Sequence, residues 1–318
     1  MAPVDRNNPK RAKASESSHS FMEFTREFPD DAACLDYLWR QRYSADGSTA
    51  FCERCNKPRT HKRYEGRPSY DCTACGLHIH PTAGTIFHKS STSLHLWFFA
   101  MYVMASTRCG ISAKQLEREL GVTYKTAWRM FNLIRNEVMA DDDGRLSGDV
   151  EADETLIGGK MRNSERRKRE ALGWDKKKYD HEKKTMVFAA VERGGRVKAM
   201  VVPDSRGETL ASSLAEFVEP DAVLFTDEWA GYNKPGRTFR AHHQIRHRDR
   251  IYVDGWTHTQ TAEGFFSLLK NALRGVHHGV SDKWLQGYLN EYVWRYNRRH
   301  QPRAMFLDLL DTAASRTR

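Results

Sequence analysis

Residues 258–275, "HTQTAEGFFSLLKNALRG", combine a polar start with the pattern of an amphipathic helix. At 100° per residue, one side of this helix carries an apolar stripe made by Phe265, Phe266, Leu268, Leu269 and Leu273. Glu263 and Lys270 are two helical turns apart and lie on nearly the same face, with Arg274 one turn further on. A solvated face with spaced charges has the same pattern, so the rest of the sequence has to decide whether this row is functional.

The composition of the 318-residue chain favours a polyanionic partner. Aromatic residues make up 11% of the chain, which argues against a disordered chain. Its formal net charge of +10 favours nucleic acid binding. The longest apolar run, at 94–105, has 12 residues, fewer than the roughly 20 that span a bilayer. The first 20 residues lack the apolar core of a signal peptide. We therefore expect a cytoplasmic protein, nucleoid-associated when bound to DNA, of two or three domains.

Four of the six cysteines form two CxxC pairs that are separated by 16 residues. They are Cys52, Cys55, Cys72 and Cys75. Each pair presents two thiolates to one tetrahedral ion, and two pairs complete its ligand shell. The spacing predicts one structural Zn²⁺ in a zinc ribbon at 47–90; the alternative is a chance grouping in a loop. Cys34 and Cys109 lie outside this pattern and are expected to be buried small hydrophobes.

The first half of the chain divides by composition and periodicity. Ahead of residue 146 we expect a disordered tail at 1–20, a helical segment at 21–46 with a break at Pro29, the zinc ribbon, and a helix-turn-helix domain at 91–145.

The helix-turn-helix domain is predicted from three helical patterns, at 92–106, 112–120 and 123–140. Gly121 separates the last two, which makes 123–137 the candidate recognition helix. Its candidate DNA-contacting residues are Thr123, Tyr124, Lys125, Thr126 and Arg129. A three-helix bundle with no DNA role has the same pattern, but the adjacent ribbon and the positive charge favour DNA.

Beyond residue 146 the hydrophobic period becomes that of strands. Strands are expected at 149–153, 185–193, 196–203 and 222–227, and helices at 207–218, 261–275 and 281–298. Gly194-Gly195 is a hairpin turn signal between two of the strands. This order, with one crossover, predicts an α/β domain with a mixed sheet at 146–300, followed by a C-terminal tail at 301–318.

Residues 160–184 are a basic insertion in this domain, with eleven Lys or Arg against five Asp or Glu. A solvated loop and a flexible basic arm that lies against a phosphate backbone are both consistent with this composition.

Three acidic residues stand out in the second half by their positions. Asp153 is expected at the end of the first strand, Asp227 ends "AVLFT", and Glu263 begins the helix quoted above. Carboxylates from different elements can hold a pair of Mg²⁺ ions about 3.5–4 Å apart. The acidic neighbours Glu151, Glu154 and Glu228 prevent composition alone from choosing the ligands.

Longer motifs resolve this choice. They are "CERC…CTACG", "TAGTIFHKSSTSLHLWFFAMY", "GISAKQLERELGVTYKTAWRM", "VEADETLIGGK", "FTDEWAGY" and "HTQTAEGFFSLLKNALRGVHHGVSDKWLQGYLNEYVWRYNRR". With them, residues 21–300 resemble bacterial insertion-sequence transposases of the IS1595 family, which have an ISXO2-like catalytic domain.

The resemblance implies an RNase H-like domain with an Asp-Asp-Glu triad. The corresponding triad here is Asp153, Asp227 and Glu263, as ligands of two Mg²⁺ or Mn²⁺ ions. Lys270 then contacts a phosphate or base beside the cut, and Gln260 and Arg274 are further DNA-binding candidates. The family usually has Asn, within "HTN", where Gln260 stands; both side chains are amides.

The sequence therefore predicts a DNA transposase that binds terminal inverted repeats, cleaves element ends by metal-dependent hydrolysis and joins the 3′-OH to target DNA. Its partners are double-stranded DNA and, because two ends must be joined, a second copy or more of itself. One alternative is an inactive, transposase-derived DNA-binding regulator, against which the intact triad argues. Another is a metal-dependent nuclease without strand transfer, which the sequence does not distinguish.

Overall fold

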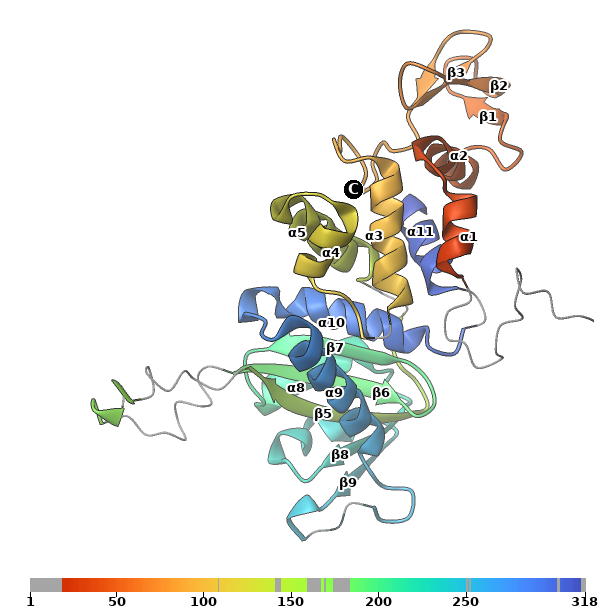
Figure 1. Cartoon of the computed structure of the whole chain (residues 1–318). Helices are drawn as coiled ribbons and strands as arrows, with labels where there is room; N and C mark the ends of the chain where they lie inside the picture. The colour runs from red at the N-terminus through yellow and green to blue at the C-terminus, as the bar shows by residue number, and fades with distance from the viewer. Residues whose placement is uncertain are drawn as a thin grey trace, which may run out of the picture. The chain divides into compact units, whose positions relative to one another are not determined.

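The computed structural model (Figure 1) describes most of the chain. The described residues are 19–107, 109–140, 144–158, 167–168, 170–173, 184–249, 251, 253–301 and 304–315. Most of the basic insertion at 160–184 and nearly all of the tail at 1–20 lie outside them. The chain divides into a helical unit (Met1–Arg108, Ala113–Val138 and Arg298–Arg318) and a sheet unit (Cys109–Ser112 and Met139–Asn297).

The helical unit combines helices from the first half of the chain with one helix from the C-terminal end. They are α1 (Phe21–Glu27), α2 (Asp31–Arg42), α3 (Leu94–Ser106), α4 (Ala113–Leu120), α5 (Tyr124–Leu133), η1 (Ile134–Val138) and, from the C-terminal end, α11 (Met305–Ser315). Ser20 and Glu23 form a capping box at the start of α1, and Asp30 accepts from the Ala33 N–H at the start of α2. Among the described residues, no helix is both long and apolar enough to span a membrane.

Helix α11 shows that the expected tail at 301–318 was wrong over residues 305–315. Its Phe306, Leu309 and Leu310 are buried. The Phe306 ring lies 5.5 Å from that of Phe24 and 5.9 Å from that of Phe28, measured between centroids. The segment is helical because this apolar stripe completes the aromatic core against α2 and α3.

The four-stranded ribbon joins this core through one aromatic stack. Its strands β1 (Thr49–Cys52), β2 (Lys57–Tyr64), β3 (Ser69–Cys72) and β4 (His78–Ile79) form an antiparallel sheet in sequence order. The rings of Trp39 on α2 and Tyr70 on β3 are stacked with centroids 4.2 Å apart. Trp39 Nε1 also donates to Gly47 O at 2.9 Å, so the ribbon is attached to α2 by both packing and a hydrogen bond.

Helices α4 and α5 follow the predicted pair of helices, joined by a turn in which Gly121 has a φ of +63°. The expected single helix at 123–140 is wrong in detail, because α5 ends at Leu133 and continues as the π-helix η1. The buried side chains recur every four residues, as Met130, Ile134 and Val138 and as Phe131 and Arg135. Such a stripe drifts by about 40° per turn of an α-helix, and the wider π turn reduces that drift.

The sheet unit is built on a mixed five-stranded sheet, which confirms the predicted α/β class. Its strands are β5 (Asp149–Ile157), β6 (Thr185–Glu192), β7 (Val197–Val202), β8 (Val223–Asp227) and β9 (Ala241–Ile245). The spatial order is β7-β6-β5-β8-β9, with β7, β6 and β5 antiparallel and β5, β8 and β9 parallel. Strand β9, "AHHQI", was not predicted because its polar residues give no apolar alternation.

Helices cover both faces of this sheet (Figure 1). Helix α8 (Gly207–Phe217) packs in the core cluster that contains Val150 and Ala152 of β5. Helix α9 (Gln260–Ala272), continued by η5 (Leu273–His277), contacts β5 and β6. Because side chains alternate along a strand, Glu151 and Asp153 face away from the α8 side. Leu268 was expected in the buried stripe of α9 but is 61% exposed.

Helix α10 (Asp282–Asn297) pairs the free edge of β7 through amide side chains. Asn297 accepts from the Val197 N–H at 2.8 Å and donates to Val197 O at 3.0 Å. Gln286 accepts from the Val201 N–H at 2.9 Å. These bonds satisfy the backbone groups of Val197 and the N–H of Val201 on the free edge of β7.

Replacing Phe306 by Ala should lower the free energy of unfolding by about 3–5 kcal/mol, because it leaves a cavity in the aromatic core. The exposed Leu268→Ala should change it by less than about 0.5 kcal/mol. Denaturant unfolding followed by tryptophan fluorescence measures both. Equal effects of the two variants would contradict the assignment of α11 to the core.

Candidate functional site

The parallel pairing of β5 and β8 brings two of the predicted acids together. Asp149 pairs with Val223 and Glu151 with Phe225. The same register, continued by two residues, places Asp153 beside Asp227 at the end of β8. Asp153 itself lies in the middle of β5, not at its end as expected, because β5 continues in its pairing with β6.

The raised pKa of Asp153 shows that other acidic side chains lie around it. Burial raises the pKa of the Asp153 carboxyl to about 8, although the Glu154 N–H donates to it at 2.8 Å. The negative charges that also raise this pKa are those of Glu154, Asp227 and Glu263. Asp227 and Glu263 therefore both lie close enough to Asp153 to influence its charge.

Two adjoining cavities contain these acids. The first, of about 310 Å³, is lined by Asp153, Thr155, Glu263, Phe266, Ser267, Lys270, Asn271 and Arg274. The second, of about 390 Å³, is lined by Glu154, Thr155, Leu156, Met186, Ser205, Asp227, Trp229 and Lys270. Thr155 and Lys270 line both, so Lys270 stands between the part of the site with Glu263 and the part with Asp227.

Lys270 is held in place by Thr155, whose Oγ1 accepts a hydrogen bond from its Nζ. Burial lowers the pKa of Lys270, and the positive charges of Arg274 and Lys184 lower it further, while the negative charge of Asp153 raises it. The row of Glu263, Lys270 and Arg274 that the sequence predicted therefore lines one cavity with Asp153.

The donor set of this site suits a hard divalent cation. Carboxylate oxygens are the ligands that Mg²⁺ prefers, and a cation would relieve the repulsion that raises the Asp153 pKa. Asp153, Asp227 and Glu263 do not form a tight group of ligand atoms: within the described ranges, the four ribbon cysteines are the only such group with all ligand atoms inside 4.8 Å.

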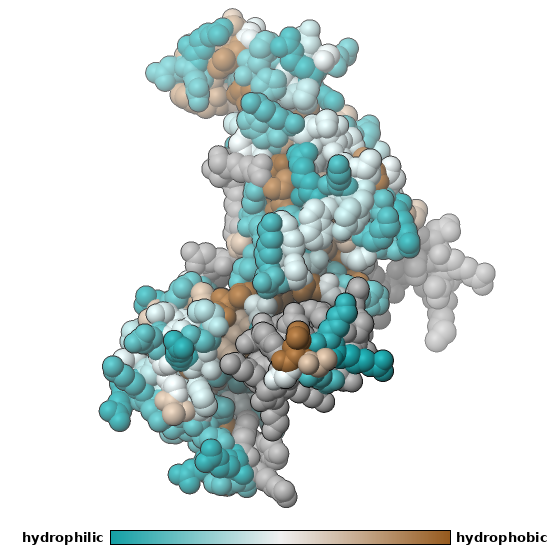
Figure 2. Space-filling view, turned by 90° about the vertical axis from the view of Figure 1, so that its left-hand side faces the viewer, coloured by the Kyte–Doolittle hydropathy of each residue, from teal (hydrophilic) through white to brown (hydrophobic). Residues whose placement is uncertain are grey.

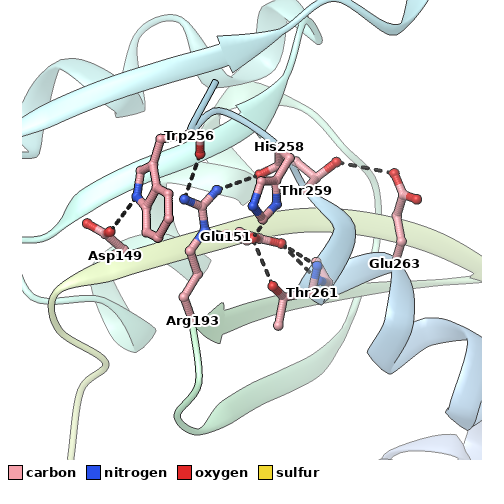
Figure 3. A network of polar contacts seen from close by, with 9 residues as sticks. Asp149, Glu151, Arg193, Trp256, His258, Thr259, Thr261 and Glu263 are labelled. Carbon is pink, nitrogen blue, oxygen red and sulfur yellow. Dashed lines mark hydrogen bonds and ion pairs between the residues drawn. The ribbon is translucent and has the colours of Figure 1, made fainter. Parts of the chain in front are cut away.

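Glu151 is a buried carboxylate with several hydrogen bonds, and the sequence did not single it out from its acidic neighbours. Its side chain is fully buried and accepts a hydrogen bond from Arg193 Nε at 2.8 Å (Figure 3). It also accepts from the backbone N–H groups of Thr261 and Ala262, at 2.7 Å and 3.1 Å, at the start of α9. Its position two residues before Asp153, on the same strand face, was the available signal.

The ribbon cysteines have the spacing of a tetrahedral metal site. Cys52 Sγ lies 3.5 Å from Cys75 Sγ, and Cys55 Sγ lies 4.0 Å from Cys72 Sγ. Four thiolates around Zn²⁺, at about 2.3 Å each, lie about 3.8 Å from one another. Desolvation raises the pKa of Cys72, but the N–H groups of Ala74 and Cys75 and the neighbouring thiols outweigh it and lower this pKa to about 7. These residues therefore fit a structural zinc ion.

The two remaining cysteines differ in exposure. Cys34 is buried, as expected, whereas Cys109 is exposed, which corrects the prediction that both are buried. Cys109 precedes Gly110, whose φ is +82°, in the connection between α3 and α4.

Comparison with known proteins finds a family match for the part of the chain that contains the three acids. Residues 145–297 match the ISXO2-like transposase domain family. This part of the chain is an ISXO2-like transposase domain. The resemblance seen in the sequence is thereby confirmed. The match begins four residues before β5 and ends with α10, so it includes both cavities and the buried Glu151.

Two relatives are also similar to this chain, and the match to the first covers more residues than the transposase domain contains. Over 234 residues the chain is 28% identical to a Halobacterium salinarum protein described as "Uncharacterized protein in transposable element ISH50", covering 71% of this chain and 77% of that protein. Over 102 residues it is 26% identical to an "Uncharacterized transposase-like protein" of Haemophilus influenzae, covering 32% of this chain and 81% of that protein.

A fourth acid of the transposase domain, Glu154, lies beside Asp227 in the second cavity. Burial raises its pKa to about 7, and the charge of Asp227 contributes, while the hydrogen bond from Tyr232 OH opposes the rise. Tyr232 is fully buried in the core on the α8 side of the sheet. Because Glu154 faces Tyr232, it differs in surroundings from Asp153, although the two are adjacent in sequence.

The predicted DNA-contacting residues of α5 divide into two groups. Thr123 caps the helix, accepting from the Thr126 N–H at 3.4 Å, so both threonines shape the start of α5. Tyr124, Lys125 and Arg129 are exposed. In the transposase domain, Gln260 and Arg274 are exposed as well.

Replacing Cys52 or Cys75 by Ser should remove stoichiometric zinc and unfold the ribbon, because three ligands no longer satisfy the ion. The transposase domain should keep its own unfolding transition. Zinc is measured by atomic absorption, with Cys109→Ser as the control that retains one equivalent. One equivalent of zinc retained by Cys52→Ser would contradict the four-cysteine site.

Replacing Asp153 by Asn should stabilise the metal-free protein by about 1 kcal/mol or more near pH 8. With a folded-state pKa of about 8, raised from 3.8, wild-type Asp153 holds a proton that the unfolded chain releases, so wild-type stability falls as pH rises from about 4 to 8. Below pH 4 the two proteins should converge. Denaturant unfolding at several pH values between 4 and 8, with chelator present, measures this difference in stability. Asp221→Asn, at an exposed position, is the control. A stabilisation by Asp153→Asn that does not depend on pH would contradict the raised pKa of Asp153.

Proposed function

We propose that this protein is a DNA transposase that cuts the ends of a mobile element and joins them to target DNA. The observation that carries the proposal is the convergence of Asp153, Asp227 and Glu263 in the ISXO2-like transposase domain. The order β7-β6-β5-β8-β9, with three antiparallel and then two parallel strands, supports the RNase H-like fold that the resemblance implies.

Asp153, Asp227 and Glu263 would hold two Mg²⁺ or Mn²⁺ ions, which supply activation of the attacking oxygen and neutralisation of phosphate charge. Lys270, oriented by Thr155, provides a fixed positive charge between the two cavities and holds a phosphate in register. Arg274 extends this positive row by one turn and contacts the next phosphate of the strand.

Two reactions follow in one site. In the first, water attacks the phosphodiester at the element end, and the P–O3′ bond breaks to leave a free 3′-OH. In the second, this 3′-OH attacks a target phosphodiester; a new P–O3′ bond joins the element to the target, and the P–O3′ bond of the target breaks to release a target 3′-OH. Both are phosphoryl transfers by positioning and charge stabilisation, so no covalent protein–DNA intermediate is required.

End recognition is assigned to the helical unit. Lys125 and Arg129 are four residues apart and share an exposed face of α5. In the ribbon, Lys57, Lys62 and Arg63 of β2 are exposed, and Figure 2 shows the ribbon, uppermost in that view, with a mainly hydrophilic surface. We assign both surfaces to double-stranded DNA, and the joining of two ends to a homodimer or larger assembly.

The similarity to a protein in the transposable element ISH50 and to a transposase-like protein supports a role in element mobility. A metal-dependent nuclease without strand transfer shares the same acids. Joined products, scored apart from nicked products, separate the two activities.

Asp153→Asn, Asp227→Asn and Glu263→Gln should each lower the Mg²⁺-dependent nicking rate on end DNA by on the order of a hundredfold or more, because each removes a metal ligand. Lys270→Ala should cost roughly tenfold, since it removes a positioning charge but no ligand. Rates are compared at equal DNA occupancy, by gel analysis of labelled ends.

Glu228→Gln is the matched control, because Glu228 adjoins Asp227 in sequence but accepts from the Arg248 N–H at 2.8 Å. It should retain most of the activity. Substantial nicking by Glu263→Gln, or loss in Glu228→Gln while Asp227→Asn stays active, would overturn the proposed triad.

A further inference from the structure

The start of α9 has an unusual capping arrangement. The first N–H groups of a helix have no partner within the helix and need an acceptor. Thr259 occupies the N-cap position but makes no side-chain capping bond. Its Oγ1 instead lies 3.2 Å from Glu263 Oε1, in position to donate to the carboxylate that the proposed function assigns to metal binding.

Glu151 of β5 takes the place of the missing cap. Its Oε2 accepts from the N–H groups of Thr261 and Ala262, and its Oε1 accepts from Thr261 Oγ1 at 2.9 Å. A carboxylate at this point also complements the positive end of the helix dipole. The N-terminus of α9 is therefore fixed to the strand that carries Asp153.

Arg193, just after β6, neutralises Glu151 and binds the loop that leads into α9 (Figure 3). Its Nη1 donates to Trp256 O at 2.7 Å and its Nη2 to His258 O at 2.9 Å. The His258 Nδ1 lies 3.0 Å from Glu151 Oε1, which makes an ion pair only when the ring is protonated, because the geometry is not that of a hydrogen bond. Trp256 is held in turn by its Nε1, which donates to Asp149 Oδ2 at 2.8 Å.

We infer that Glu151 and Arg193 are positioning residues that set the place of Glu263 relative to Asp153. Glu151 and Asp153 share one face of β5, and the two amides bound by Glu151 come immediately before Glu263. A shift of α9 along β5 would therefore change the separation of two proposed metal ligands. The inference rests on the proposed function for its catalytic consequence, but the docking of α9 can be tested apart from it.

The same contacts explain the polar motif at 258–263. His258, Thr261 and Ala262 contact Glu151, and Thr259 contacts Glu263. Gln260 is exposed, takes no part in these contacts and remains the candidate for DNA contact. The motif thus docks the helix, a role that the sequence did not suggest.

The test uses the full-length protein with Glu151→Gln, which keeps the shape and removes the charge. Because it leaves Arg193 buried beside a neutral side chain, the double variant Glu151→Gln with Arg193→Met provides a second form without an unpaired charge. Glu192→Gln is the matched control: Glu192, the last residue of β6, is also in an ion pair, 3.2 Å from Arg196, and its hydrogen bonds among the described residues go to Ser147 and Arg196 instead of to α9.

Amide hydrogen exchange should be faster at residues 261–263 in both Glu151 variants, by about ten- to a hundredfold, the effect of losing a charge-assisted hydrogen bond. Exchange in β6 and β7 should stay unchanged. Mn²⁺ should bind more weakly by calorimetry, and the Mg²⁺ concentration for half-maximal nicking should rise, with much of the rate recovered at high Mg²⁺. Glu192→Gln should match the wild type in all three measurements.

Unchanged exchange at 261–263 in both Glu151 variants would overturn the docking role. Faster exchange with Mn²⁺ affinity and Mg²⁺ dependence unchanged would overturn its consequence for Glu263. If the wild type itself neither binds Mn²⁺ nor nicks end DNA, the proposed function fails, and exchange alone then decides whether Glu151 docks α9.

Discussion

A carboxylate with no exposure to solvent has to be neutralised by the protein, and Glu151 imposes this constraint on the transposase domain. Its partners come from the end of β6, from the loop before α9 and from the first turn of α9. Satisfying one charge therefore brings three separate segments into contact with the central strand. The sheet provides the frame, but this contact determines where the helix that carries Glu263 begins.

Two residues further along the same strand, Asp153 shows the opposite condition. It is largely buried among other acids, and its pKa of about 8 records how poorly the metal-free protein stabilises its charge. Glu151 is neutralised by its partners, whereas Asp153 keeps a proton in the metal-free protein, so this domain lacks a neutralising cation at one place. That place adjoins Lys270 and both cavities, which is where a cation and a phosphate would meet.

The helical unit is organised by different forces. Ring contacts among Phe24, Phe28 and Phe306 build its core, and the stack of Trp39 on Tyr70 attaches a ribbon too small for a core of its own. A zinc ion held by the four closely spaced thiols would supply the ribbon with the stability that burial does not. The exposed lysines and arginines of β2 and α5 lie on rigid elements, which suits contact with a phosphate backbone.

Local pattern was enough to predict the CxxC pairs, the mixed α/β sheet and most element positions, because thiol spacing and hydrophobic period are local properties. Family motifs also singled out Asp153, Asp227 and Glu263, and their convergence was an expectation that depended on β5 and β8 pairing in register. What the sequence did not reveal depends on distant contacts: α11 is helical because it completes a remote core, and β9 because it pairs with β8. The role of Glu151 belongs to the same class, since an acid in a strand becomes the cap of a helix 110 residues later only once the tertiary structure has brought them together.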